Sequence, residues 1–164
     1  MLLILWLVIS CEGINEPELI GVIPLEYKNK EIISKSVNGD VALVWRCFTE
    51  PKDIVKWFFV SQNFYCSFAF NSLTTGENFT YRMDPKKEGQ GFDIEGTFEK
   101  VVPLKELSFH SKDSYTQMKF IEKDSQVEIN ITIKYDKENS PMDMKYVWEC
   151  LLDNFSQYIE NIKN

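Results

Sequence analysis

The sequence has a single histidine, His110, among 164 residues. This scarcity excludes a multi-histidine metal site and leaves few routes to a histidine-dependent nucleophile. The four cysteines form no C-x-x-C pair and no metal-ligand spacing. Cys47, Cys66 and Cys150 lie in apolar segments, where we expect small buried side chains rather than disulfides. We therefore predict no metal and no cofactor, and a cytoplasmic location.

The sequence also lacks an excess of positive charge. It contains 18 basic and 25 acidic residues, for a net charge of −7. Such a chain repels a phosphate backbone, so we expect no nucleic acid among its partners. The short basic clusters at 28–31 and 85–88 each contain an acidic residue and read as solvated surface.

No apolar run is long enough to span a bilayer, which takes about 20 residues. The longest run, "MLLILWLVIS" before Cys11, has no basic residues ahead of it. Three interpretations stay open: an export signal, including a lipoprotein-type one anchored through Cys11, an upstream extension, or an extra packed segment. We expect residues 1–26 to be an apolar segment and tether outside the domain, which spans 27–164.

The sequence is rich in aromatic residues. Phe, Tyr and Trp make up 14% of it, and hydrophobic residues as a whole make up 44%. A single domain of this length buries about 70% of its unfolded surface, so it can build its own core. That many rings favour a thick core or an aromatic-walled cavity.

Helical spacing is confined to two places. After a β-prone run at 31–37, "VALVWRCF" at 41–48 predicts a short helix capped by Asn38 or Asp40. A second begins at Thr49 or Glu50, with Pro51 in its first turn. The last helix starts at Ser140, Pro141 and Asp143 and runs for about 22 residues. Its apolar stripe comprises Met144, Trp148, Leu151, Phe155, Tyr158, Ile159 and Ile162.

Between these helices the apolar period is two, which is typical of antiparallel strands with one wet face. The clearest strand, 127–135, places Val127, Ile129, Ile131, Ile133 and Tyr135 on one face. Other residues expected to face inward are Phe64, Cys66, Phe68, Phe70, Phe79, Tyr81, Met83, Phe92 and Ile94. The order predicts an α+β fold: one strand, two short helices, about six further antiparallel strands and one long helix.

Three glycines lie in "YRMDPKKEGQGFDIEGTF", residues 81–98. Their spacing fits neither a dinucleotide fingerprint nor a Walker loop, and a strand rather than a helix follows. We therefore interpret 85–91 as a hairpin connection and Gly96 as the site of a bulge or bend in a strand.

Five segments carry a resemblance to a known family: "VW" at 44–45, "FTEPKDIVKWF" at 48–58, "NSLTTGENFTYRM" at 71–83, "GFDIEGTFEKVVP" at 91–103 and "WECLLDNFSQYIE" at 148–160. In order and spacing the chain resembles the START-like (SRPBCC, helix-grip) superfamily. Within it, the chain is most similar to the family named for the carboxy-terminal domain of the activator of the heat-shock-protein-90 ATPase. "NGD" at 38–40 replaces a frequent proline, and Val147 replaces a frequent glycine.

The resemblance implies a curved antiparallel sheet of six to seven strands wrapped on the long carboxy-terminal helix, with an apolar cavity between them. The candidate lining residues are Trp57, Tyr81, Met83, Phe92, Ile94, Phe120, Trp148 and Leu152. The alternative is that these rings simply fill the core. Eukaryotic activators carry a further amino-terminal domain, for which 164 residues leave no room, so we do not expect stimulation of a chaperone ATPase.

The implied function is non-enzymatic binding of a small hydrophobic or amphipathic ligand. The alternative is a co-chaperone-like domain that uses its surface to bind a chaperone or another protein. An enzyme, such as a cyclase- or hydrolase-like relative, ranks last and we predict no catalytic residue. Asp93 and Glu95 are the nearest paired carboxylates, but they alternate with apolar residues and should face outward, where Arg82 can pair with them.

Overall fold

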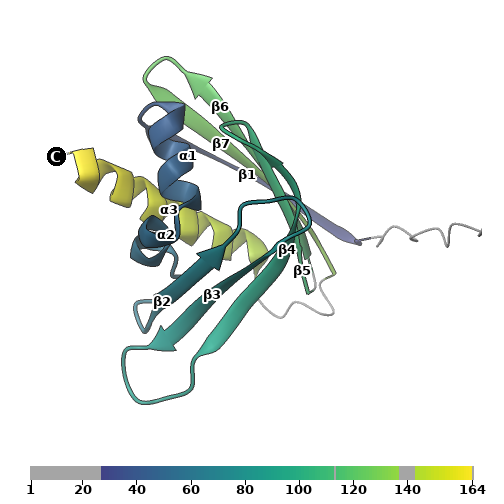
Figure 1. Cartoon of the computed structure of the whole chain (residues 1–164), viewed down its shortest axis with the longest axis vertical. Helices are drawn as coiled ribbons and strands as arrows, with labels where there is room; N and C mark the ends of the chain where they lie inside the picture. The colour runs from purple at the N-terminus through teal and green to yellow at the C-terminus, as the bar shows by residue number, and fades with distance from the viewer. Residues whose placement is uncertain (1–26, 113, 137–142, 164) are drawn as a thin grey trace, which may run out of the picture.

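The computed structural model describes residues 27–112, 114–136 and 143–163 as one α+β unit (Figure 1). Its elements in chain order are β1 (Asn29–Asn38), α1 (Val41–Thr49), α2 (Pro51–Trp57), β2 (Phe64–Asn71), β3 (Asn78–Pro85), β4 (Phe92–Val102), β5 (Glu106–Ser111), β6 (Ser114–Lys123), β7 (Gln126–Tyr135) and α3 (Met144–Lys163). The predicted order of elements is confirmed. The predictions on residues 1–26 lie outside the described residues.

The strands form one antiparallel sheet in the order β1-β7-β6-β5-β4-β3-β2. Every connection from β2 to β7 is a hairpin, whereas α1 and α2 carry the chain from β1 at one edge to β2 at the other. The sheet curls around the three helices, with α3 running along the concave side (Figure 1). This is the predicted helix-grip arrangement.

The two short helices begin where the sequence predicts. The Asp40 carboxylate accepts a hydrogen bond from the Leu43 amide at 2.8 Å and so caps α1. Glu50 ends α1 and precedes α2, in which Pro51 takes the first position, where no amide donor is needed. Both helices direct apolar side chains at the sheet, and those buried are Val44, Trp45, Phe48, Ile54 and Trp57.

The alternation predicted for 127–135 is confirmed, because every inward residue of β7 is buried. Ile131 pairs with Ile33 of β1 and with Met118 of β6, so branched and flexible apolar side chains interlock across three strands. Helix α3 packs on β1 at this edge of the sheet.

The prediction for β2 is wrong in its second half. The register of β2 against β3 shifts between Cys66 and Phe68, so Ser67 is an extra residue. An extra residue in a strand reverses the alternation, so that side chains after it that would have faced inward face outward. Cys66 and Ala69 are therefore buried, while Phe68 and Phe70 are 56% and 53% exposed on the outer face.

The predicted ends of the last helix also need correction. Helix α3 begins at Met144, and the Asp143 carboxylate accepts a hydrogen bond from the Tyr146 amide at 3.2 Å. Asp143 therefore caps the helix, and Ser140 and Pro141 lie outside the described residues. Ile162 is 41% exposed, because the last turn of α3 continues past the final buried position, Ile159.

The hairpin predicted at 85–91 is confirmed, since Met83 pairs directly with Phe92. Gly96 has a different role from the one predicted, because it pairs regularly and the bulge in β4 falls between Phe98 and Lys100. A Cβ atom at Gly96 would lie 2.6 Å from the ring of Phe79. The glycine is needed because that ring lies directly over the backbone.

Candidate ligand-binding cavity

A cavity of about 510 Å³ separates the inner face of β2–β6 from α2 and α3. Its lining side chains are predominantly aromatic or aliphatic. They are Phe48, Thr49, Ile54, Trp57, Phe58, Phe59, Val60, Ser61, Phe64, Asn71, Leu73, Phe79, Tyr81, Met83, Phe92, Ile94, Phe98, Leu107, Phe109, Ser111, Ser114, Thr116, Met118, Met144, Val147, Trp148 and Leu151.

The sheet wall is a layer of rings that pack on one another along the strands. The ring of Phe79 lies 5.0 Å from Tyr81, 5.3 Å from Phe98 and 4.9 Å from Phe109, measured between centroids. The contact with Phe109 is edge to face, which is a preferred geometry for aromatic pairs. Two rings of this layer also reach the helix side, because Tyr81 lies 5.0 Å from Phe58 at the end of α2 and Phe109 lies 6.5 Å from Trp148 of α3.

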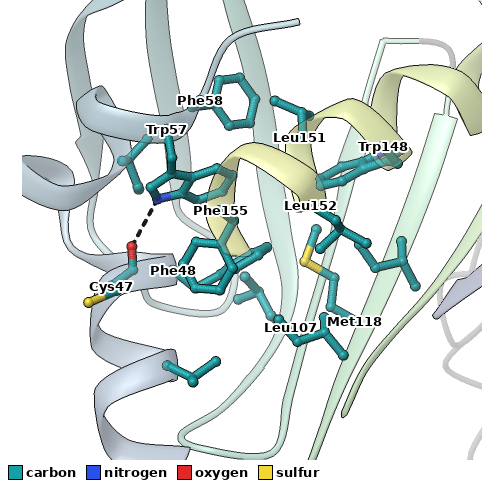
Figure 2. Close-up of a cluster of buried hydrophobic side chains, with 14 of the residues drawn as sticks. Cys47, Phe48, Trp57, Phe58, Leu107, Met118, Trp148, Leu151, Leu152 and Phe155 are labelled. Carbon is teal, nitrogen blue, oxygen red and sulfur yellow. Dashed lines mark hydrogen bonds between the residues drawn. The ribbon is translucent and has the colours of Figure 1, made fainter. Parts of the chain in front are cut away.

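The helix wall is fixed by a second aromatic cluster where α1, α2 and α3 meet the sheet (Figure 2). The Trp57 indole donates a hydrogen bond to the Cys47 carbonyl at 3.0 Å, which satisfies its only donor in a buried place (Figure 2). Trp57 also packs against Phe48 at 5.0 Å and Phe155 at 4.9 Å. These contacts fix one face of the cavity.

One exposed apolar residue of the lining, Phe92, marks the rim of the cavity. Phe92 is 48% exposed and packs edge to face on Phe64, with 5.6 Å between ring centroids. The segment after α2 is held to α3 by the Asn154 amide, which donates to the Phe59 carbonyl at 2.5 Å. This hydrogen bond fixes the backbone of Phe59 against α3.

One polar group on the wall is the hydroxyl of Tyr81. Burial raises the pKa of this phenol well above its ordinary value, and a hydrogen bond with Asn71 only partly offsets the effect. The Asn71 amide in turn donates to the Thr49 carbonyl at 2.9 Å. Tyr81 is therefore neutral at physiological pH and can both donate and accept a hydrogen bond.

A second polar group lies at the hairpin between β5 and β6. The hydroxyls of Ser111 and Ser114 lie 2.7 Å apart and hydrogen-bond to each other. Thr116, which is also buried, follows on the same face of β6. Tyr81 and the Ser111–Ser114 pair thus come from different strands of the sheet.

Six of the eight candidate lining residues line this cavity: Trp57, Tyr81, Met83, Phe92, Ile94 and Trp148. Phe120 and Leu152 do not line it. Phe120 packs edge to face against Trp45 and Phe48, at 5.1 and 5.4 Å, in the filled part of the core. Leu152 is 1% exposed and lies one position beyond Leu151, the member of that pair that lines the cavity.

The sequence-based prediction missed the contribution of β5, and on β6 it named Phe120 instead of Ser114, Thr116 and Met118. Leu107, Phe109 and Ser111 alternate along β5 and line the cavity. Their period-two spacing was the available signal, but it does not distinguish a cavity wall from a packed face. The lining segment 58–61 follows the end of α2, lies outside any helix or strand and has no periodic signal.

Asp93, Glu95 and His110, the candidates for acid–base chemistry, do not line the cavity. Arg82 pairs with Asp84 at 3.0 Å and with Asp93 at 3.3 Å, as the outward alternation predicts. His110 is exposed on β5, and its Nδ1 lies 3.4 Å from the Tyr27 hydroxyl. Within the described part of the chain, no three His, Cys, Asp or Glu residues are grouped closely enough to hold a metal ion.

A buried carboxylate ties the three helices together behind the cavity. Asp53 of α2 accepts a hydrogen bond from the Tyr158 hydroxyl of α3 at 2.5 Å. Arg46 of α1 lies 3.9 Å from its other oxygen, Oδ2, which accepts no hydrogen bond from the described residues. Burial, followed by the hydrogen bond to Asp53, raises the pKa of Tyr158 to about 12. We interpret this cluster as a structural link between α1, α2 and α3.

No helix among the described residues combines the length and the apolar character needed to cross a membrane.

Solved structures share this fold. The AHSA1-like protein from Aeromonas hydrophila matches with a TM-score of 0.74 and 25% identity, over 81% of this chain and 94% of that one. A protein from Nitrosomonas europaea matches with a TM-score of 0.72 and 19% identity, over 82% and 96% of the two chains. One from Cytophaga hutchinsonii matches with a TM-score of 0.67 and 24% identity, over 81% and 93%.

A comparison with curated proteins found no significant match. Comparison with protein families matches residues 38–160 to the Activator of Hsp90 ATPase homolog 1-like proteins. The match covers the chain from the end of β1 to the last turns of α3, and it confirms the resemblance found in the sequence. This chain belongs to the family of Activator of Hsp90 ATPase homolog 1-like proteins.

Proposed function

We propose that this chain is a non-enzymatic binding module that encloses a small apolar or amphipathic molecule between its sheet and α3. The observation that carries the proposal is the cavity of about 510 Å³ with its aromatic and aliphatic wall. Small-molecule sites commonly occupy about 300 to 1,000 Å³ and combine apolar walls with a few polar groups. Tyr81 and the Ser111–Ser114 pair supply such groups here.

The chemistry of the wall supports binding rather than catalysis. Among its described residues, the polar side chains are hydroxyls, a phenol and an amide, and none is a carboxylate, imidazole or thiol. A serine needs a nearby base to become a nucleophile, and Ser111 and Ser114 contact each other instead. The residues of the cavity are thus suited to holding a molecule rather than to proton transfer.

The test is a ligand screen read out by melting temperature, since a ligand that binds only the folded chain raises that temperature. We expect hits among lipids and aromatic metabolites. Ile94→Trp, which fills the cavity, should abolish the shift. Ile121→Trp on an exposed position of β6 is the matched control and should retain it. An absence of hits, or equal shifts in both variants, would count against the proposal.

A second candidate function is contact with an Hsp90-type chaperone through the outer face of β2. It is favoured by the exposed rings of Tyr65, Phe68 and Phe70 on this edge strand and by the name of the family. Exposed aromatic residues are enriched in protein interfaces. Binding of purified Hsp90 to the wild type, and its loss in the Phe68→Ser/Phe70→Ser variant, would support this function. Equal binding to both proteins would reject it.

We further propose that the binding module acts in the cytoplasm. Cys47, Cys66 and Cys150 are free thiols, which suits a reducing compartment. Export or lipid anchoring through Cys11 is the alternative. Cell fractionation of the full chain distinguishes the two, because an anchored chain would sediment with membranes.

A further inference from the structure

The cavity wall carries no formal charge. Among the described residues that line it there is no Asp, Glu, Lys, Arg or His. The one titratable side chain, Tyr81, is a phenol that keeps its proton at physiological pH, and burial raises its pKa further. A ligand inside the cavity therefore meets hydroxyl and amide dipoles but no opposite charge.

Two charged groups that directly adjoin residues of the wall are engaged elsewhere. Asp53 precedes Ile54 of the wall, but its carboxylate accepts from Tyr158 and faces Arg46. Arg82 lies between two wall residues of β3, yet it points to the outer face and pairs with Asp84 and Asp93. Neither charge lines the cavity.

Polar recognition inside the cavity is possible through hydroxyl groups. Ser111 and Ser114 use one hydrogen bond between them, which leaves further donor and acceptor capacity on this pair. The phenol of Tyr81, which also lines the cavity, can likewise donate and accept a hydrogen bond. Both arrangements suit a neutral hydroxyl or carbonyl, because each can donate a hydrogen bond to either group and can also accept one from a hydroxyl.

We propose that the ligand of this cavity is an uncharged amphiphile whose polar end is a hydroxyl or carbonyl group, and that the wall rejects its carboxylate and ammonium analogues. This inference rests on the proposed binding function. Removing an ion from water without a partner of opposite charge is costly, whereas a neutral hydroxyl that forms a hydrogen bond is not. The net charge of −7 adds a general repulsion of anions.

The test uses dodecanol, dodecanoic acid and dodecylamine, which share a chain and differ in the charge of their polar end near neutral pH. Trp57 and Trp148 line the cavity, so their fluorescence reports binding. We expect dodecanol to bind at least about tenfold more tightly than either charged analogue, because of the desolvation penalty. If a charged analogue binds as tightly as dodecanol, the inference is overturned while the proposed function stands. If none of the three binds and the wider screen also fails, the proposed function falls, and the inference with it.

A charge placed at the rim sharpens the test. Phe92 lines the cavity and is 48% exposed, so Phe92→Lys can be accommodated with its ammonium group in water. We expect this variant to bind dodecanoic acid several-fold more tightly relative to dodecanol, and Phe92→Gln to leave the ratio unchanged. An unchanged ratio in Phe92→Lys would contradict the claim that a missing cation sets the preference.

The polar end is tested by removing hydroxyls. Tyr81→Phe and the Ser111→Ala/Ser114→Ala pair are measured separately, and one of them should weaken dodecanol binding by about three- to tenfold, as expected for a lost hydrogen bond. Tyr115→Phe removes a tyrosine hydroxyl outside the lining and is the matched control. If neither change weakens binding more than this control, the wall does not recognise the polar end and the inference is wrong.

Discussion

The two ends of the sheet are built differently. At the packed end, formed by β1 and β7, branched aliphatic side chains interlock, and Ile129, Ile131 and Ile133 have no exposed surface. None of the described residues of these two strands lines the cavity. At the hollow end, formed by β2–β5 and by the part of β6 from Ser114 to Met118, rings such as Phe79 contact their neighbours along the sheet. One sheet thus supplies both a packed core and one wall of the cavity.

The difference follows from the side chains and from the position of the helices. Helix α3 packs on β1, so the packed end meets it directly. The hollow end is curved by two bulges, at Ser67 of β2 and between Phe98 and Lys100 of β4. A bulge increases the local twist and bends the strand, which carries this end away from a straight helix. We infer that the packed end supplies most of the stability, and we propose the hollow end as the binding site.

The largest expected effect comes from truncating one isoleucine at each end. Ile131→Ala at the packed end should lower the free energy of unfolding by about 2–5 kcal/mol, as for fully buried aliphatic residues. Ile94→Ala should cost about 1 kcal/mol or less, because this side chain is half-buried and already borders empty space. Urea unfolding of both variants measures the difference. Equal losses would show that the two ends do not differ in packing.

A smaller effect is expected at the link that holds α2, beside the hollow end, to α3. Tyr158→Phe removes the hydroxyl that donates to the buried Asp53 carboxylate and should cost about 1–3 kcal/mol. Tyr65→Phe, at a position that is 44% exposed, is the control and should change stability less. If the two variants lose the same stability by urea unfolding, the link is not important.

The same tyrosine predicts a dependence of stability on pH. The pKa of Tyr158 is raised from 10.0 to about 12 in the folded chain. Folding therefore favours the neutral form of Tyr158. The contribution of this residue to the free energy of unfolding is complete below about pH 10 and is lost as the pH rises through about 12. The wild type should lose more stability across this window than Tyr158→Phe. Parallel pH profiles would contradict the assignment.

The smallest effect is expected on the outer face of β2. Phe68→Ser should change stability by no more than about 0.5 kcal/mol, because the side chain is 56% exposed. An inward-facing phenylalanine would instead cost about 3–5 kcal/mol on truncation. Thermal melting distinguishes these values easily. A large loss would mean that the strand has no bulge at Ser67.

The sequence was informative where one rule governs a whole element. The strict alternation from Val127 to Tyr135 predicted β7, and the capping residues Asp40 and Pro51 located the short helices. It failed at β2 because a bulge depends on the twist of the paired strands, and no residue of "NFYCSFAFN" specifies an extra position.

The cavity was predictable in part and for a related reason. Period and polarity show which face of a strand is apolar, so Tyr81, Met83 and Ile94 could be named in advance. Neither signal tells whether a helix reaches that face. Phe120 has the same alternation as the residues of the wall, yet it packs against Trp45 and Phe48 because α1 covers this part of β6.

The most direct test of the hollow end is an NMR titration of the isotopically labelled chain with dodecanol. We predict chemical-shift changes concentrated on residues of the wall, including Ile94, Met118 and Trp148, with little change at Ile131 and Val37 of the packed end. Changes confined to the outer face around Phe68 and Phe70, or spread evenly over the molecule, would contradict the account.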